Sequence, residues 1–455
     1  MSNTNNNGHT DATSISVQQV LDDNTLSFFQ YRTIMLAFLI VLYVGYTSAE
    51  MGFIGPALAS DLHVTPAQLN PTMVASLIGL AIGSFIAGPL ADKLGRKKVL
   101  LAAVTVFGVF SVFASQMNTV ISISMMRLFV GLGLGAAMPI SVTLVSEYSP
   151  TKLRSFLVAV MFCGFTAGSA GVGFVASALL PDYGWQGVLS VGGWVALVTL
   201  IPLIILLPES AKYLVEKNKS TDKIRSYLNK IGSVPATVEH FTSDHNVAAK
   251  PANAQKTSAM SKLFNAELGT GTVMLWVIFF MTMAYIGVYT NWLPMMFGLL
   301  GYEQAQSATL AALFQIGGTV GALIIGMLMD RVSPYKALGV SLLVGTVFTA
   351  AMAFYNSSYA AIFLGFLIIG VTISGGMVGF NALAAAFYPT SARATGVSWA
   401  LGVGRFGSIS GSLIGGYLLD QQMSFGGIMS LLIIPVIVTT VLIFYMGVRY
   451  DKRKA

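Results

Sequence analysis

Charged residues are scarce in this chain. Only 9% of its 455 residues are Asp, Glu, Lys or Arg, whereas a soluble domain carries about 25%. Hydrophobic residues make up 55% of the chain. A soluble fold needs a more polar surface than this composition provides, so the sequence predicts a protein embedded in a membrane.

Cysteine and histidine are nearly absent from the apolar parts. Cys163 is the single cysteine, which excludes an internal disulfide. The four histidines, His9, His63, His240 and His245, lie in tails or loops, so no histidine is available to carry a proton within the membrane. No nucleophile–base set, metal-ligand cluster or phosphate loop is present. The sequence predicts neither an enzyme nor a bound metal or cofactor.

Long apolar segments dominate the rest of the chain. Each is near or above the roughly 20 residues that cross a bilayer as a helix. The twelve segments cover residues 34–58, 71–91, 99–116, 120–144, 155–180, 188–208, 273–297, 307–329, 337–355, 359–386, 395–419 and 427–448. We therefore predict an all-α membrane protein with twelve transmembrane helices.

Lysine and arginine lie on one side of these segments. If the N-terminus is cytoplasmic, 23 of the 25 fall in cytoplasmic stretches, and the other two, Arg127 and Arg405, lie within spans. This is the positive-inside pattern. It predicts a multi-pass protein of a bacterial inner membrane with both termini in the cytoplasm. It also accounts for the net charge of +7 without any nucleic-acid partner.

Polar residues divide the spans into two groups of six. The first 27 residues are polar and are expected to be a disordered tail, and the start of the central linker is expected to be an amphipathic helix on the inner face. The predicted parts are a cytoplasmic tail (1–30), a six-helix bundle (31–208), a cytoplasmic linker (209–270), a second six-helix bundle (271–448) and a short tail (449–455).

The two groups of spans repeat one motif. The first copy ends span two and contains Gly88, Asp92, Gly95 and Arg96; the weaker copy, 238 residues later, contains Gly326, Asp330 and Arg331. Arg154 and Arg393, after spans four and ten, are 239 residues apart. The chain is therefore expected to be a duplication of one six-helix unit. Because six spans separate the copies, both have the same orientation and form parallel repeats.

These motifs resemble those of the major facilitator superfamily. The residues that carry the resemblance are Gly88…Asp92…Gly95-Arg96-Lys97, Arg127…Gly131…Gly133…Gly135 and Pro208-Glu209-Ser210. The resemblance covers residues 30 to 450 and implies a secondary transporter that works by alternating access.

The loop motif is predicted to gate the inner side. Asp92 can cap a neighbouring helix, and Arg96 can pair with an acid such as Glu147 or with the carbonyls of a helix C-terminus. We expect such contacts to break when the bundle opens inward. The remaining predicted gating residues are Arg154, Asp330, Arg331 and Arg393. The alternative is that these charges serve only to fix topology.

Three ionisable residues lie within spans, where a charge is costly and is a functional candidate by default. Arg405 is predicted to bind an anion, because a guanidinium holds a carboxylate with two parallel hydrogen bonds; a permanent pair with a protein acid is the alternative. Glu50 is predicted to be the proton site. The alternative for Glu50 is a fixed salt bridge to Arg127.

A narrower resemblance is to the aromatic acid/proton symporter family. It is carried by Gly52-Phe53-Ile54-Gly55-Pro56-Ala57-Leu58, by Asn291-Trp292-Leu293-Pro294 and by the run from Arg393 to Arg405. It implies that Arg405 is the family's substrate-linked arginine. The family's Asp-Gly-aromatic-Asp motif is replaced here by Val44-Gly45-Tyr46-Thr47. Glu50 lies one helical turn beyond Thr47, and we hypothesise that it takes over the proton site.

The predicted function is import of a small organic anion, such as a benzoate or hydroxybenzoate, together with protons. The predicted substrate-binding residues are Arg405, Asn381, Tyr46, Thr47, Tyr289, Trp292 and Trp399; the aromatic ones could instead serve packing or the membrane interface. A monomer is expected. A carrier for a non-aromatic carboxylate or another solute, an exporter and a non-transporting receptor remain alternatives.

Overall fold

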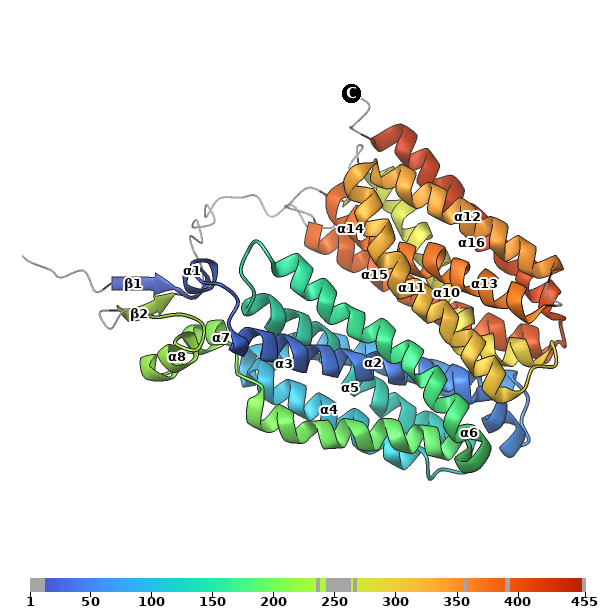
Figure 1. Ribbon diagram of the computed structural model, residues 1–455, viewed down its shortest axis with the longest axis horizontal. Helices are drawn as coiled ribbons and strands as arrows, with labels where there is room; N and C mark the ends of the chain where they lie inside the picture. The colour runs from blue at the N-terminus through green and yellow to red at the C-terminus, as the bar shows by residue number, and fades with distance from the viewer. Residues whose placement is uncertain are drawn as a thin grey trace, which may run out of the picture.

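The computed structural model describes residues 13–234, 238–242, 263–264, 268–355, 358–388 and 393–451. These residues form two helical bundles that lie side by side, with a small unit at one end of the first (Figure 1). The N-terminal bundle consists of α2 (Phe28–Asp61), α3 (Asn70–Leu94), α4 (Arg96–Ala114), α5 (Val120–Glu147) and α6 (Arg154–Leu206). The C-terminal bundle consists of α10 (Gly269–Gly298), α11 (Gln304–Arg331), α12 (Pro334–Phe354), α13 (Tyr359–Ile369), α14 (Gly375–Phe387), α15 (Arg393–Asp420) and α16 (Phe425–Tyr450).

The prediction of twelve membrane-spanning helices in two repeats is confirmed. Among the described residues, ten helices are long and apolar enough to cross a membrane. α6 contains predicted spans five and six, which join at Gly184, where φ is 61°. α13 and α14 form span ten, joined by the π-helical turn η2 (Gly370–Ser374), and α15 is span eleven.

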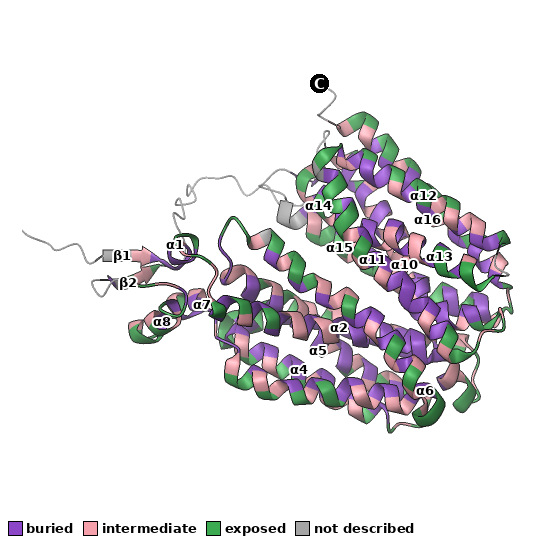
Figure 2. Ribbon diagram, viewed as in Figure 1, coloured by how far each residue is buried: buried purple, intermediate pink, exposed green. Residues whose placement is uncertain are grey.

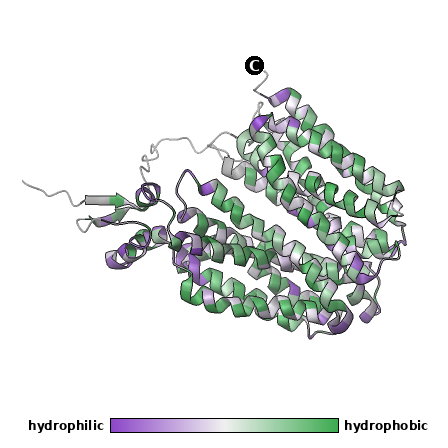
Figure 3. Cartoon of the chain, in the orientation of Figure 1, coloured by the Kyte–Doolittle hydropathy of each residue, from purple (hydrophilic) through white to green (hydrophobic). Residues whose placement is uncertain are grey.

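The surface of the bundles is that of a protein in lipid. Large apolar side chains such as Phe85, Ile205 and Phe406 are exposed, and exposed residues line the outer sides of the helices (Figure 2). Hydrophilic residues gather at the bundle ends and in the small unit (Figure 3). A soluble monomer rarely exposes so much contiguous apolar surface to water.

The small unit corrects the prediction of a disordered N-terminal tail. Residues 13–27 are ordered, with β1 (Thr13–Ser16) followed by α1 (Val17–Asp22). β1 pairs in parallel with β2 (Val238–Thr242) of the central linker. α2 begins at Phe28, where Ser27 and Gln30 form a capping box. The predicted tail is therefore wrong for its described part; residues 1–12 lie outside that part.

The linker contributes α7 (Ala211–Glu216) and α8 (Thr221–Leu228) to this unit. α8 is amphipathic, as predicted for this stretch, but its apolar side faces protein. Ile224 and Leu228 are buried in one cluster with Val17, Val20 and Leu21 of α1. Burial of both apolar faces in this cluster, which also includes residues of the N-terminal bundle, explains why helices this short are ordered.

Close contacts between helices repeat in the two bundles. In the N-terminal bundle, a methyl group added to Gly79 of α3 would overlap the carbonyl oxygen of Leu128 in α5. In the C-terminal bundle, the same holds for Gly317 of α11 and the carbonyl oxygen of Leu367 in α13. The glycines are 238 residues apart and the carbonyls 239. These are the offsets of the sequence motifs, so the duplication extends to helix packing.

The two bundles meet at the end where α2 turns into α3, which we call the Asn70 end; the end where α3 turns into α4 is the Asp92 end. At the Asn70 end, the Asn70 side chain donates to the carbonyl of Leu413, at 3.4 Å. Gly52 of α2 lies against the carbonyl oxygen of Thr290 in α10. In Figure 1 the two bundles diverge toward the Asp92 end.

Candidate functional site

Glu50 and Arg127 form an ion pair inside the N-terminal bundle. Glu50 lies on α2 and Arg127 on α5, and both side chains are completely buried. The second guanidinium nitrogen of Arg127 donates to the carbonyl of Thr47, at 3.1 Å. The second carboxylate oxygen of Glu50 has no hydrogen-bond partner among the described residues. The structure thus shows, in this conformation, the ion pair with Arg127 that the sequence left as the alternative for Glu50, and the role of Glu50 as a proton site stays a prediction.

The matching position of the C-terminal bundle has no charge. The repeat offsets place Val288 or Tyr289 opposite Glu50, and Gly365 or Phe366 opposite Arg127. In the structure the rings of Tyr289 and Phe366 are in contact, with centroids 5.6 Å apart. None of Val288, Tyr289, Gly365 and Phe366 carries a charge, so the ion pair has no counterpart at the matching positions of the C-terminal repeat.

Arg405 lies near the middle of α15 and reaches the opposite bundle. Its Nη1 atom donates to the hydroxyl of Ser84 on α3, at 3.0 Å. The side chain is exposed, and no carboxylate of the described residues lies within 4.0 Å of it. The alternative of a permanent pair with a protein acid is thus not seen among the described residues, and anion binding by Arg405 stays a prediction. Ser84 was not predicted, because one serine in an apolar helix carries no signal of its own.

Tyr46 and Thr47 of α2 are both buried. The Tyr46 hydroxyl donates to the carbonyl of Val188 in α6, at 3.1 Å. Thr47 contributes its carbonyl to Arg127. In this conformation both residues surround the ion pair and are not open to solvent.

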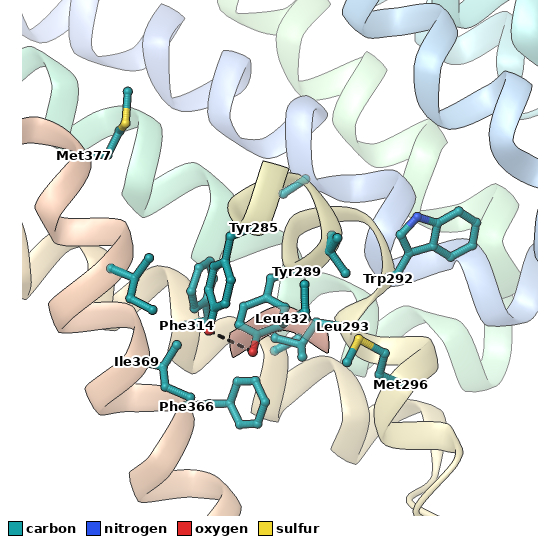
Figure 4. Close-up of a cluster of buried hydrophobic side chains, with 14 of the residues drawn as sticks. Tyr285, Tyr289, Trp292, Leu293, Met296, Phe314, Phe366, Ile369, Met377 and Leu432 are labelled. Carbon is teal, nitrogen blue, oxygen red and sulfur yellow. Dashed lines mark hydrogen bonds between the residues drawn. The ribbon is translucent and has the colours of Figure 1, made fainter. Parts of the chain in front are cut away.

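Tyr289 and Trp292 of α10 point in different directions (Figure 4). Tyr289 lies inside the C-terminal bundle, where the hydroxyl of Tyr285 donates to its hydroxyl at 2.9 Å. The Trp292 indole donates to the carbonyl of Ser412 in α15, at 2.7 Å. Both rings are buried, and among the described contacts neither residue has Arg405 as a hydrogen-bond partner.

Asn381 and Trp399 lie toward the Asp92 end of the C-terminal bundle. The Asn381 amide donates to the carbonyl of Met377, one turn earlier in α14, at 3.1 Å, and its oxygen has no partner among the described residues. Trp399 stacks on Trp276 with ring centroids 5.7 Å apart. At roughly 100° per residue, Trp399 projects from α15 about 120° away from Arg405, so the two share no face.

The loop motif forms a charge cluster at the Asp92 end. Arg96 pairs with Glu147 at 3.2 Å, as predicted, and with Asp92 at 3.3 Å. It also donates to the carbonyl of Ala91 near the end of α3, at 3.4 Å. Asp92 remains 72% exposed, and its described contact is with Arg96. Asp92 caps no helix among the described residues in this conformation, and its role as a cap stays a prediction for the inward-closed state.

A second acid caps the next helix. Glu209 accepts hydrogen bonds from the backbone amides of Arg96 and Lys97 at the start of α4, at 2.7 and 3.2 Å. This satisfies two free amides and places a negative charge at the positive end of the helix dipole. Glu209 belongs to the Pro208-Glu209-Ser210 motif, but the sequence did not indicate which helix it would cap.

Gly95 makes this cap possible. Its backbone (φ 99°, ψ 155°) is in a region open almost only to glycine, and a methyl group there would overlap the Glu209 carboxylate. Gly88 is different, because nothing lies within 4 Å of the methyl group it lacks.

The remaining predicted gating residues are Arg154, Asp330, Arg331 and Arg393. Arg154 donates to the side chain of Gln18 in α1, at 2.7 Å, and so holds the N-terminal segment. Arg331 is exposed at the end of α11. The side chains of Asp330 and Arg393 lie outside the described part of the structure. Among the described residues, no group of three or more His, Cys, Asp or Glu side chains could hold a metal ion.

The model of the Major Facilitator Superfamily matches residues 34–310 and 275–455. The chain is 41% identical to the 4-hydroxybenzoate transporter PcaK of Pseudomonas putida, covering 95% of this chain and 96% of that protein. It is 38% identical to the gallate transporter of Pseudomonas putida (95% of each). It is 32% identical to the benzoate transport protein of Acinetobacter baylyi (96% and 93%).

Solved structures show the same fold at low sequence identity. The xylose transporter XylE of Escherichia coli, in a partially occluded inward open conformation, superimposes with a TM-score of 0.70 at 17% identity, over 94% of this chain and 99% of that one. A bacterial homologue of the human lysosomal transporter Spinster, inward-facing and unoccupied, gives a TM-score of 0.68 at 15% identity, over 93% and 98%.

Proposed function

The chain belongs to the major facilitator superfamily, and from this premise we propose that it imports an aromatic carboxylate, such as a benzoate or hydroxybenzoate, together with protons. The observation that carries the proposal is the Arg405 side chain. It is exposed at mid-helix, it faces the opposite bundle, and its described partner is a neutral hydroxyl. An unneutralised guanidinium at this depth is costly without an anionic ligand.

Arg405 holds the carboxylate in this proposal. A guanidinium has five donors in a planar fork, and Ser84 uses one of them. Two parallel donors remain for the two oxygens of a carboxylate. Relatives at 32% to 41% identity are named for 4-hydroxybenzoate, gallate and benzoate, and each of these anions joins a carboxylate to an aromatic ring. This agreement supports the substrate class.

Glu50 carries the proton. Its first carboxylate oxygen bonds Arg127, while the second has no partner. A proton can therefore bind the second oxygen while Arg127 keeps its bond to the first. A neutral Glu50 leaves the Arg127 charge uncompensated in a low-dielectric interior. That cost favours a change of conformation that brings the pair to water, where the proton is released.

Alternating access follows from the contacts between the bundles. Asn70 contacts Leu413 and Gly52 contacts Thr290 at the Asn70 end. With the orientation that the positive-inside pattern favours, the Asn70 end faces outward and both termini are cytoplasmic. The conformation is then inward-facing. Arg96 keeps its pairs with Glu147 and Asp92 in it, against the expectation that these contacts break on inward opening. The inner gate at the Asp92 end then depends on contacts between the bundles, including those of Asp330, Arg331 and Arg393. We place the protein, as a monomer, in a bacterial inner membrane.

A ligand panel tests this proposal. Purified protein is heated with benzoate, 4-hydroxybenzoate, a dicarboxylate, a sugar and the uncharged amide of benzoate, and the melting temperature is recorded. We expect the aromatic carboxylates to raise it and the amide to have no effect. Arg405→Ala should abolish the shift. A carboxylate that still stabilises the Arg405→Ala protein would overturn the assignment, and a response to sugars alone would overturn the substrate class.

A further inference from the structure

In the proposed substrate site, Ser84 of the N-terminal bundle contacts Arg405 of the C-terminal bundle. It lies at the fifteenth position of the 25 residues of α3, and the Arg405 guanidinium donates to its hydroxyl at 3.0 Å. The Ser84 hydroxyl in turn donates to the carbonyl of Leu80, one turn earlier in α3, at 2.7 Å. Its single hydrogen is therefore used within its own helix, and its lone pairs are directed to Arg405.

The contact lies deep between the bundles. On α15, Arg405 is eight residues before Leu413, which receives the Asn70 hydrogen bond. At 1.5 Å per residue, the two contacts are about 12 Å apart along the helix. Ser84 therefore meets Arg405 inward of the closed end, where a substrate must lie to be reached from the open end.

The neutrality of Ser84 matters for an anion site. An acid at this position would form a permanent ion pair with Arg405 and compete with the substrate. A residue without an acceptor would leave the long arginine side chain free to adopt many rotamers, and the substrate would then bear the entropic cost of ordering it. A hydroxyl orients the guanidinium without cancelling its charge.

We propose that Ser84 is a positioning residue that orients Arg405 for the carboxylate of the substrate. This inference rests on the proposed function, because it assumes that Arg405 binds the anion. Ser84 lies on α3 of one bundle and Arg405 on α15 of the other. The orientation of the guanidinium therefore depends on how the two bundles lie relative to each other. That relative position changes in the step in which the site opens.

The test compares three substitutions at Ser84. Binding of 4-hydroxybenzoate to purified protein and uptake by proteoliposomes are both measured. Ser84→Ala should raise Kd and KM about five- to tenfold, within the range of a typical lost intramolecular hydrogen bond, with the maximal rate within twofold of wild type. Ser84→Thr keeps the hydroxyl and should restore both constants. Ser84→Asp should weaken binding by more than a hundredfold.

The controls separate this inference from the proposed function. Ser430→Ala removes an exposed hydroxyl that donates to the carbonyl of Gly426 within α16, and it should leave both constants unchanged. If Arg405→Ala binds substrate as wild type does, the proposed function fails. If Arg405→Ala loses binding but Ser84→Ala does not, only the role of Ser84 fails. Ser84→Thr behaving like Ser84→Ala would also overturn it, provided that the melting temperatures without ligand agree.

Discussion

Glu50 and Arg127 are each other's counter-ion in the interior of the N-terminal bundle, and neither side chain reaches solvent. The corresponding positions of the other repeat, Val288 or Tyr289 and Gly365 or Phe366, carry no charge. A scaffold role would not require a charge in one repeat and none in the other. The asymmetry therefore supports a chemical role for the pair, in addition to its contribution to stability.

Neutralising Glu50 should separate exchange from accumulation. Glu50→Gln cannot release a proton, so proteoliposomes should lose proton-driven accumulation of substrate but keep exchange of internal for external substrate. Both are measured with radiolabelled 4-hydroxybenzoate. Accumulation at the wild-type level in Glu50→Gln would contradict the assignment of Glu50 as the proton site.

The effects of replacing Glu50 and Arg127 on the stability of the protein should be strongly non-additive. Replacing Glu50 alone leaves a buried arginine without a counter-ion, which costs about 3–5 kcal/mol. Replacing both residues, as in Glu50→Gln with Arg127→Met, removes the buried charge altogether. We therefore expect the double variant to melt at a higher temperature than Glu50→Gln alone. A double variant that is less stable by the sum of the two single effects would show that the pair is not coupled.

Gly95 should be far less tolerant of substitution than Gly88, although both belong to the loop motif. Gly95→Ala forces a side chain into a backbone region that costs about 1–3 kcal/mol, and it displaces the Glu209 cap of α4. Gly88→Ala adds a methyl group in open space. The melting temperature of purified protein should fall by several degrees for Gly95→Ala and stay unchanged for Gly88→Ala. Equal effects would argue against the cap.

The N-terminal segment should protect the loop between α5 and α6. Asp22 accepts hydrogen bonds from the amide and hydroxyl of Thr151, at 2.6 and 2.8 Å. Asp22→Ala removes both bonds, so trypsin should cleave at Lys152 or Arg154 several times faster. Asp23→Ala, next to it, removes an exposed carboxylate that makes neither bond and serves as the control. Equal cleavage rates in the two variants would refute the contact.

This protection should not depend on pH in the physiological range. Burial alone would raise the pKa of Asp22, but the bonds from Thr151 and Gln18 and the nearby charge of Arg154 lower it below its ordinary value. A lowered pKa in the folded state means that the contact is present above the unfolded pKa and is lost only as the pH falls through the folded one. The ratio of cleavage rates between Asp22→Ala and wild type should be constant from pH 5.5 to 8.

Closure of the Asn70 end should require a glycine at position 52. A methyl group on Gly52 would overlap the backbone carbonyl of Thr290 in the other bundle, so Gly52→Ala should hinder closure at the Asn70 end. We expect initial uptake in cells to fall more than tenfold, with a smaller change in ligand binding. Gly55→Ala meets only the end of the Met73 side chain at 3.4 Å and should transport normally. Normal uptake by Gly52→Ala would show that this contact does not limit closure.

The sequence was informative where the pattern is local or repeated. Apolar length identified the spans, and the motif of Asp92 and Arg96 identified the duplication. The scarcity of charge in the spans identified Glu50 and Arg127 as candidates, and their ion pair was the alternative to a free proton site at Glu50. The pairing of β1 with β2 could not be predicted in this way, because more than 200 residues separate the strands and neither is long enough to show a period of its own.

Two other features depend on how elements approach one another in space. Ser84 is significant only because α15 places Arg405 against it. Asp92 is exposed in this conformation, so its expected cap of a neighbouring helix stays a prediction for a conformation in which the inner side is closed. A contact between bundles that exists in one conformation and not in another cannot be derived from a single pattern of residues.

Uptake of radiolabelled 4-hydroxybenzoate into proteoliposomes, with and without an inwardly directed proton gradient, tests the central claim most directly. The account predicts accumulation above equilibrium when the outside is more acidic. A protonophore should abolish it, and Arg405→Ala should not show it. Uptake that is the same with and without the gradient, or that survives in Arg405→Ala, would contradict proton-coupled carriage of an aromatic carboxylate by Arg405.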